Sequence, residues 1–182
     1  MSTATRSSPG NHTDHEFAEV LAQGIAHPKT LKETIVPFLL QNPDGYIPSL
    51  LEVFDTTEMA AKRSVADIFV GPLREKAPSI LLPQLLIDKP DRFYWSAEIL
   101  GELLEERAIP SFISGLAAGN KSVVLASVKG LTRFPREDTI QALIQFFLTC
   151  PDEVFLSVSL RFLVPLHQEM VPRLLPKYAG LD

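Results

Sequence analysis

The sequence repeats itself every 31 residues, and this period constrains the fold more than any other feature. Mostly apolar residues recur at this spacing in three neighbouring phases. The first phase holds Ile47, Pro78, Ile109, Ile140 and Val171. The phases three and four positions later hold Leu50, Leu81, Phe112, Leu143 and Leu174, and then Leu51, Leu82, Ile113, Ile144 and Leu175. A fixed period of this length indicates a repeat protein whose units bury their apolar faces against one another.

Each period contains the pattern of two helices. Apolar residues recur at steps of three and four, which is typical of a helix with one buried stripe. A second helix is indicated by the phase of Ala66, Ala97, Val128 and Ser159 and by the phase of Phe69, Leu100, Leu131 and Phe162. Proline stands one residue after the first phase at 48, 110 and 172, where a helix start tolerates the missing N–H. We therefore expect an all-α fold of stacked helical hairpins.

The period also predicts the domain organisation. Residues 1–13 are rich in Ser and Thr, lack the apolar core of a signal peptide, and are expected to form a disordered tail. Residues 14–182 are expected to form a single domain. Within it, residues 14–41 would supply N-terminal capping helices, residues 46–167 four hairpins, and residues 168–182 a C-terminal capping helix. Pro37, Pro83 and Pro165 fall inside helical segments and should kink or shorten them.

The composition excludes several classes of protein. The net charge of −5 disfavours a nucleic-acid backbone as the natural partner, because such binding normally needs a basic face. Cys150 is the only cysteine, so the chain can form no internal disulfide, and no Cys/His spacing resembles a zinc site. The longest apolar stretch is far shorter than the roughly 20 residues of a membrane-spanning helix. These features predict a cytoplasmic protein without membrane contact and without a cofactor.

Residues 96–132 read SAEILGELLEERAIPSFISGLAAGNKSVVLASVKGLT. A second helix that closes on Ile99-Leu100-Gly101, a charged turn, and Ala108-Ile109-Pro110 at the next helix start resemble HEAT-like repeats. Short repeats of this kind occur in phycocyanobilin lyase subunits and in bacterial scaffold proteins. The resemblance covers about residues 46–178. It implies an α-α superhelix, a right-handed solenoid of about five HEAT-like hairpins.

The sequence departs from this family at one position. HEAT-like repeats usually carry an Arg early in the second helix, where it links neighbouring repeats by polar contacts. The residues at that position here are Lys62, Phe93, Val124 and Phe155. We therefore expect apolar packing between repeats in place of most of this Arg ladder, or an apolar surface on which a partner sits.

The resemblance also implies a binding surface, because second helices line the concave face of such solenoids. The positions expected on this face are Arg63, Tyr94, Leu125 and Leu156, then Asp67, Glu98, Lys129 and Leu160 one turn later, with Trp95, Arg133 and Arg161 nearby. Aromatic and Arg side chains are the usual anchors of protein–protein contacts, so this face predicts a bound protein or peptide. Alternatively, an apolar stripe at helical spacing fills the core, and Tyr94, Trp95, Leu125 and Leu156 would then be buried.

No group of residues indicates catalysis or metal binding. The histidines are His12, His15, His27 and His167, and the single His15-Glu16 pair offers too few ligands for a metal. The glutamates at 98, 102, 105 and 106 are expected to form a solvated acidic face, because Glu is rarely buried unpaired. The sequence thus predicts a protein that is not an enzyme.

The leading hypothesis is a scaffold or adaptor of the bacterial cytoplasm that binds another protein on its concave face. Three alternatives remain open. The resemblance to lyase subunits allows an accessory or catalytic subunit of a protein-modifying, bilin-lyase-like enzyme. The basic residues Lys121, Lys129, Arg133 and Arg136 allow a DNA-binding HEAT-like protein. An exposed apolar surface would allow self-association.

Overall fold

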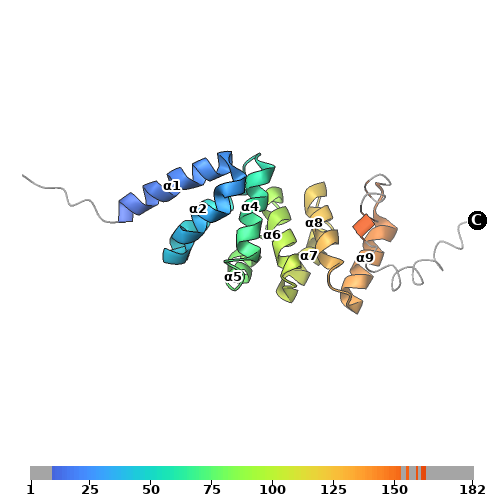
Figure 1. The fold of residues 1–182 in the computed structure, drawn as a ribbon. Helices are drawn as coiled ribbons and strands as arrows, with labels where there is room; N and C mark the ends of the chain where they lie inside the picture. The colour runs from blue at the N-terminus through green and yellow to red at the C-terminus, as the bar shows by residue number, and fades with distance from the viewer. Residues whose placement is uncertain (1–9, 153–154, 156–158, 160, 163–182) are drawn as a thin grey trace, which may run out of the picture. The chain divides into compact units, whose positions relative to one another are not determined.

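The computed structural model describes residues 10–152, 155, 159 and 161–162. All regular secondary structure among these residues is helical, which confirms the all-α prediction for them (Figure 1). The chain divides into two compact units, Met1–Arg74 and Glu75–Asp182. The prediction of one continuous domain over residues 14–182 stays a prediction, and each unit is described here by itself.

From Gly10 onward, where the description of the first unit begins, its residues form four helices. These are α1 (Gly10–Ala26), α2 (Pro28–Gln41), α3 (Pro43–Val53) and α4 (Met59–Val70). Helix α2 packs against each of the other three. An aromatic cluster joins the first three helices, because the ring of Phe17 stacks on that of Tyr46 at 4.1 Å between centroids and Phe38 packs edge-on to both. Burial of such rings is the main source of stability in a small helical unit.

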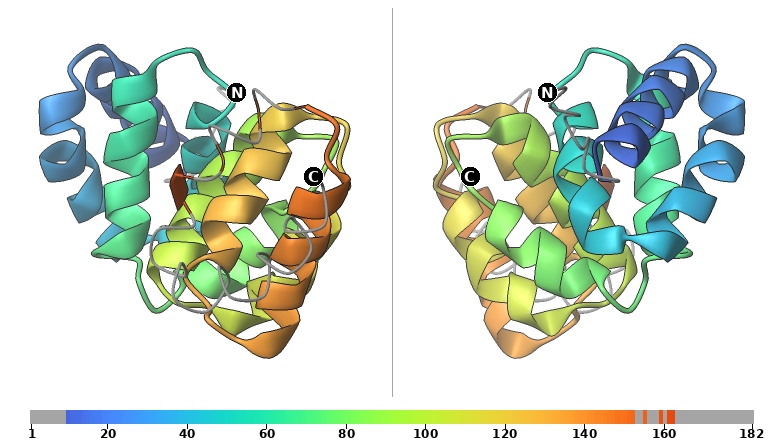
Figure 2. Two further views of the ribbon diagram at one scale, coloured as in Figure 1. Left: turned by 90° about the vertical axis from the view of Figure 1, so that its right-hand side faces the viewer. Right: turned by 90° about the vertical axis from the view of Figure 1, so that its left-hand side faces the viewer.

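The described residues of the second unit, up to Asp152, form five α-helices and two short 3₁₀ turns. These are α5 (Ala77–Leu81), η1 (Leu82–Gln84), α6 (Pro90–Glu102), η2 (Glu106–Ala108), α7 (Ile109–Gly115), α8 (Lys121–Leu131) and α9 (Glu137–Thr149). Helices α6 and α8, the second helices of consecutive hairpins, lie side by side (Figure 2). Helix α7, the first helix of its hairpin, packs against both α8 and α9. Successive hairpins in this unit therefore stack with like helices adjacent.

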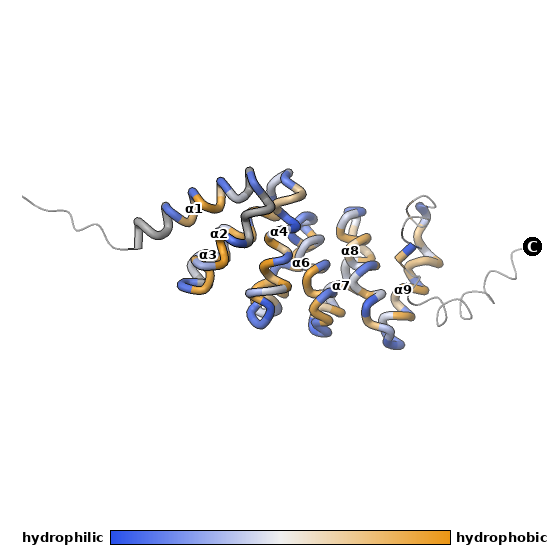
Figure 3. Tube along the Cα trace, in the orientation of Figure 1, coloured by the Kyte–Doolittle hydropathy of each residue, from blue (hydrophilic) through white to orange (hydrophobic). Residues whose placement is uncertain are grey.

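The core follows the 31-residue period. Leu50, Leu81, Phe112 and Leu143 occupy one phase and are all fully buried. Figure 3 shows hydrophobic and hydrophilic residues alternating along each described helix, as expected when one stripe faces the core. Each of these side chains contributes about 1.5–3 kcal/mol by leaving water. The repeated phase thus predicted the core correctly in both units.

Helix caps and prolines agree with the expectations from the sequence at some positions and not at others. The side chain of Asn120 caps α8, accepting from the amides of Ser122 at 2.9 Å and Val123 at 3.4 Å. Pro83 lies in a 3₁₀ turn and α5 ends at Leu81, so the predicted shortening is confirmed. Pro37 lies inside α2 without ending it. Pro165 falls outside the described residues.

The predictions for the two chain ends fall partly outside the described residues. Helix α1 begins at Gly10, inside the segment expected to be a tail, whereas residues 1–9 lie outside the described residues. The predicted C-terminal capping helix, within residues 168–182, also lies outside them, as does most of the second helix of the last hairpin. No helix among the described residues is long and apolar enough to cross a membrane.

Candidate binding surface and adjoining pocket

Seven of the predicted binding residues lie on three helices of the part of the chain that the structure describes, one helix in the first unit and two in the second. Arg63 and Asp67 lie on α4 in the first unit, and both are exposed. In the second unit, Tyr94, Trp95 and Glu98 lie on α6, Leu125 and Lys129 lie on α8, and Arg133 follows α8. Arg161 is exposed. Leu156 and Leu160 lie outside the described residues.

The aromatic and aliphatic members differ in burial. Trp95 is only 8% exposed, so its indole belongs to the core and is not offered to a partner. Its ring packs edge-on to that of Tyr94, with 5.6 Å between centroids. Tyr94 and Leu125, which are one repeat apart, are half-buried. The alternative that this stripe fills the core therefore holds for Trp95, whereas Tyr94 and Leu125 keep part of their surface in solvent.

The polar members form one connected group, here called the α6–α8 cluster: Tyr94, Glu98, Lys129 and Arg133. The ammonium of Lys129 lies 2.5 Å from the carboxylate of Glu98 and donates to the hydroxyl of Tyr94 at 3.4 Å. The guanidinium of Arg133 donates to the backbone carbonyl of Glu98 at 3.4 Å and lies 3.9 Å from its carboxylate. One carboxylate is thus shared by two cations.

The register of the two helices explains the cluster. Tyr94 and Glu98 are four residues apart on α6 and therefore share a face, as do Leu125 and Lys129 on α8. Because α6 and α8 lie side by side in a 31-residue repeat, Glu98 meets Lys129 and Tyr94 stands at the position matching Leu125. This face thus carries Tyr94 and Leu125 at matching positions and, one helical turn further along, the charged pair of Glu98 and Lys129.

Partial burial strengthens these contacts. The side chains of Lys129 and Glu98 are 20% and 21% exposed, so water screens their attraction less than at an open surface. The ammonium of Lys129 also lies 5.4 Å from the ring centroids of Tyr94 and Phe162, within the range of cation–π attraction. An ion pair, a hydrogen bond and cation–π contacts thus converge on Lys129.

The position that usually carries the Arg ladder is apolar in this unit, as expected from the sequence. Phe93 and Val124 are buried, and Phe155 is half-buried. Polar links between repeats nevertheless exist elsewhere. Besides Glu98–Lys129, the ammonium of Lys121 lies 2.5 Å from the carboxylate of Asp152. Sequence reasoning missed these links, although opposite charges 31 residues apart were a visible signal.

Two further glutamates of the expected acidic face, Glu105 and Glu106, have basic partners, whereas Glu102 is exposed. Arg136 lies 2.9 Å from the carboxylate of Glu106. Glu105 accepts from the guanidinium of Arg107 at 2.7 and 2.9 Å, and these hydrogen bonds hold the pKa of Glu105 below its ordinary value. A carboxylate held in its ionised form cannot act as a general acid near neutral pH. The arrangement is one of ion pairs at the surface.

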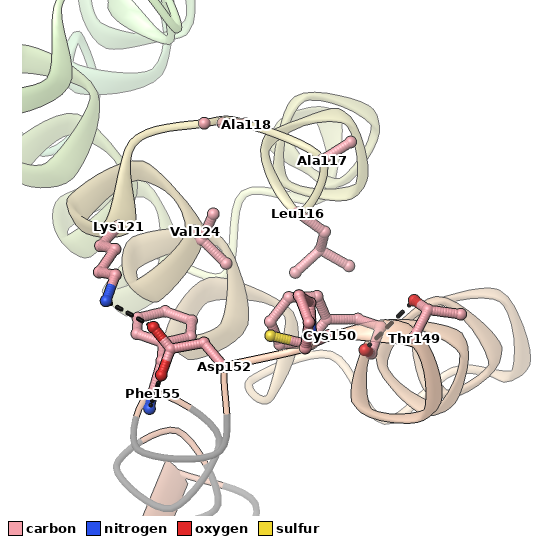
Figure 4. Close-up of a pocket in the computed structure, with 12 residues that line it drawn as sticks. Leu116, Ala117, Ala118, Lys121, Val124, Thr149, Cys150, Asp152 and Phe155 are labelled. Atoms are coloured by element: carbon pink, nitrogen blue, oxygen red, sulfur yellow. Dashed lines mark hydrogen bonds and ion pairs between the residues drawn. The ribbon is translucent and has the colours of Figure 1, made fainter.

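A pocket of about 380 Å³, here called the turn pocket, lies at the turns of two consecutive hairpins in the second unit. It is lined by Leu116, Ala117, Ala118, Gly119, Lys121, Val124, Phe146, Thr149, Cys150, Pro151, Asp152 and Phe155. Figure 4 shows the side chains of Leu116, Val124 and Cys150 gathered around it, with the Lys121–Asp152 pair at one side. Sequence reasoning did not identify this pocket, because it depends on how two turns face each other.

Comparison with known proteins assigns no relative. No family model, no curated protein and no solved structure matches this chain. Among the residues that the structure describes, no group of three or more His, Cys, Asp or Glu side chains could hold a metal ion.

Proposed function

We propose that this chain is a non-enzymatic interaction module of the HEAT-like kind, a scaffold or adaptor that holds another protein on its second helices. In this proposal, the stacked hairpins continue as a right-handed α-α superhelix in the bacterial cytoplasm. Support comes from the side-by-side placement of α6 and α8 and from ion pairs that join residues one repeat apart. Stacking of like helices is how a solenoid builds an extended binding face.

One observation carries the proposal: half-buried Tyr94 and Leu125 lie beside charged side chains that are already held in place. An apolar centre bordered by polar groups is the usual anatomy of a protein interface. Lys129 and Arg133 are fixed by Glu98, so a partner would lose little further side-chain entropy by contacting them. Two cations against one carboxylate favour a partner segment that places an acidic side chain next to an apolar one.

The DNA-binding alternative receives less support. Lys121 is paired with Asp152, Lys129 with Glu98, and Arg136 with Glu106. Phosphate binding depends on cations that are available to replace counterions along the backbone. Arg133 also lies 3.9 Å from the carboxylate of Glu98, so all four basic residues that suggested DNA already have carboxylate partners.

Affinity purification from the native source tests the proposal. The wild-type chain is compared with a variant that carries Tyr94→Ala and Leu125→Asp, and with Leu86→Asp as a control at an exposed apolar residue before α6. We expect the double variant to lose a specific co-purifying protein that the control retains, with helicity and unfolding midpoint unchanged. Retention of that protein by the double variant would show that the surface is not the binding face. Unfolding of the variant would show that the two side chains belong to the core.

A further inference from the structure

The turn pocket follows from the repeat itself, because equivalent positions of two hairpins form its opposite walls. Ala118 and Thr149 are 31 residues apart, and so are Gly119 and Cys150, Lys121 and Asp152, and Val124 and Phe155. The pocket thus lies at the junction between the α7–α8 turn and the segment that follows α9.

Small side chains keep this junction open. Three consecutive small residues, Ala117, Ala118 and Gly119, form one rim. At the position of Val124, the preceding repeat has Phe93, which is fully buried, and the following repeat has Phe155. The pocket is therefore found where a valine replaces the phenylalanine that both neighbouring repeats carry.

The polar groups of the lining are already engaged with one another. The carboxylate of Asp152 pairs with Lys121 at 2.5 Å and accepts from the amide of Phe155 at 2.8 Å. The hydroxyl of Thr149 donates to the carbonyl of Gln145 at 2.9 Å. A charged ligand would have to compete with these contacts, and lining side chains such as Leu116, Val124 and Phe146 offer it no hydrogen bond. The lining therefore favours an uncharged ligand.

The apolar walls favour an aromatic one. The rings of Phe146 and Phe155 pack edge-to-face with 6.4 Å between centroids, and the ammonium of Lys121 lies 5.9 Å from the centroid of Phe155. Aromatic rings prefer such edge-to-face contacts, and the thiol of Cys150 adds a sulfur that packs well against a ring. An apolar cavity of roughly 150 Å³ can bind benzene, so about 380 Å³ accommodates a substituted ring.

We propose that the turn pocket is a binding site for a small, uncharged aromatic molecule. The proposal does not depend on the partner surface formed by α6 and α8. The proposed ligand is a free small molecule. Insertion of an aromatic side chain from another protein is the alternative that the experiment must distinguish from it.

The chain contains its own reporter, because Cys150 is its only cysteine and lies in the pocket wall. The rate of alkylation of Cys150 by iodoacetamide is measured in the full chain with increasing benzyl alcohol. Benzoate and benzylammonium serve as charged probes of similar size, cyclohexylmethanol as a non-aromatic one, and an acetylated Gly-Phe-Gly amide as the side-chain probe. A thermal-unfolding scan with each probe gives a second readout that does not depend on thiol reactivity.

We expect benzyl alcohol to slow alkylation saturably, by about tenfold at roughly ten times its Kd, and to raise the unfolding midpoint. The charged probes should have no saturable effect, and cyclohexylmethanol should bind more weakly.

Val124→Phe, which restores the phenylalanine of the neighbouring repeats, should abolish the effect of benzyl alcohol. Leu86→Phe, which adds a ring at an exposed site, should leave it intact. If Val124→Phe does not fold, Ala118→Phe fills the pocket from its rim.

Several results would overturn the proposal. These are no saturable protection by benzyl alcohol, equal protection by the charged probes, or full protection in the filled variant. Equal binding of cyclohexylmethanol would remove the preference for aromatic rings. Tighter binding of the capped peptide than of benzyl alcohol would assign the pocket to a protein side chain.

Discussion

At the scale of single residues, Leu104 has a backbone conformation that leucine rarely adopts. The residue lies just beyond the end of α6, and its side chain is 61% exposed. Its φ of 55° lies in the left-handed region. The amides of Glu105 and Leu104 donate to the carbonyls of Leu100 and Gly101, a helix ending in which this position is usually glycine.

Leu104→Gly should therefore stabilise the protein. Relief of the left-handed strain is worth about 1–2 kcal/mol, and the greater freedom of glycine in the unfolded chain costs about 0.4–1 kcal/mol. We expect a net gain of about 0.5–1 kcal/mol in the free energy of unfolding, measured by urea titration. Leu86→Gly, at an exposed leucine with ordinary φ, should instead lower this free energy.

Gly115 marks a close contact between α7 and α8. A Cβ at this position would collide with the hydroxyl of Ser127 and lie 3.0 Å from the ring of Phe93. Gly115→Ala should therefore lower the free energy of unfolding by about 1–3 kcal/mol, the usual cost of overpacking. Gly119→Ala is the matched control, because a Cβ there meets nothing within 4 Å, and it should cost little.

A second substitution makes this prediction sharper. The hydroxyl of Ser127 is buried without a hydrogen-bond partner, so Ser127→Ala removes both this group and the atom that collides with the new methyl. We expect Gly115→Ala to cost less in the Ser127→Ala background, and a double-mutant cycle measures the coupling. Additive effects would show that the collision is relieved elsewhere, for example by movement of Phe93.

At the scale of helices, local patterns predicted the elements better than their ends. The apolar phases and the prolines indicated where helices lie, because helix periodicity and proline geometry are local properties. Asp91 shows the limit: Asp is a favoured capping residue, but the cap position of α6 is Lys89, and Asp91 lies inside the first turn. Pro90 between them takes the first helical position, which proline favours.

The contact between α6 and α8 yields a prediction for the α6–α8 cluster. Lys129→Met removes the closest cation of half-buried Glu98 and leaves only Arg133, 3.9 Å away. We expect a loss of about 1–2 kcal/mol in the free energy of unfolding, between the values for exposed and buried ion pairs. Lys121→Met is the control, because Lys121 is 72% exposed and its pair with Asp152 should contribute less than about 0.5 kcal/mol. Equal losses would mean that burial does not distinguish the two pairs.

At the scale of the whole molecule, the period predicted the all-helical class and the core phases, and it left the surface undetermined. Second helices such as α6 carry apolar residues on more than one side, so the pattern could not decide that Trp95 is buried while Tyr94 is partly exposed. The turn pocket was missed for a similar reason. It arises from missing volume at Val124, which becomes visible only when two repeats are placed side by side.

Continuity of the proposed superhelix can be tested with the single tryptophan. Trp95 lies in the second unit, so its fluorescence reports unfolding there, whereas far-UV circular dichroism reports helices throughout the chain. If the hairpins form one coupled array, we expect the two signals to follow the same urea transition. Separate transitions would show that the two units unfold independently, and would contradict a single domain over residues 14–182.

The ion pairs between repeats also have a consequence for how the chain folds during its synthesis. Glu98 meets Lys129 and Lys121 meets Asp152, so each pair closes a loop of only one repeat. Closing a loop costs more chain entropy as the loop lengthens, so contacts between neighbouring repeats cost less entropy than contacts between distant parts of the chain. A growing chain can therefore complete each junction of the second unit once the next hairpin has left the ribosome, without waiting for its C-terminus.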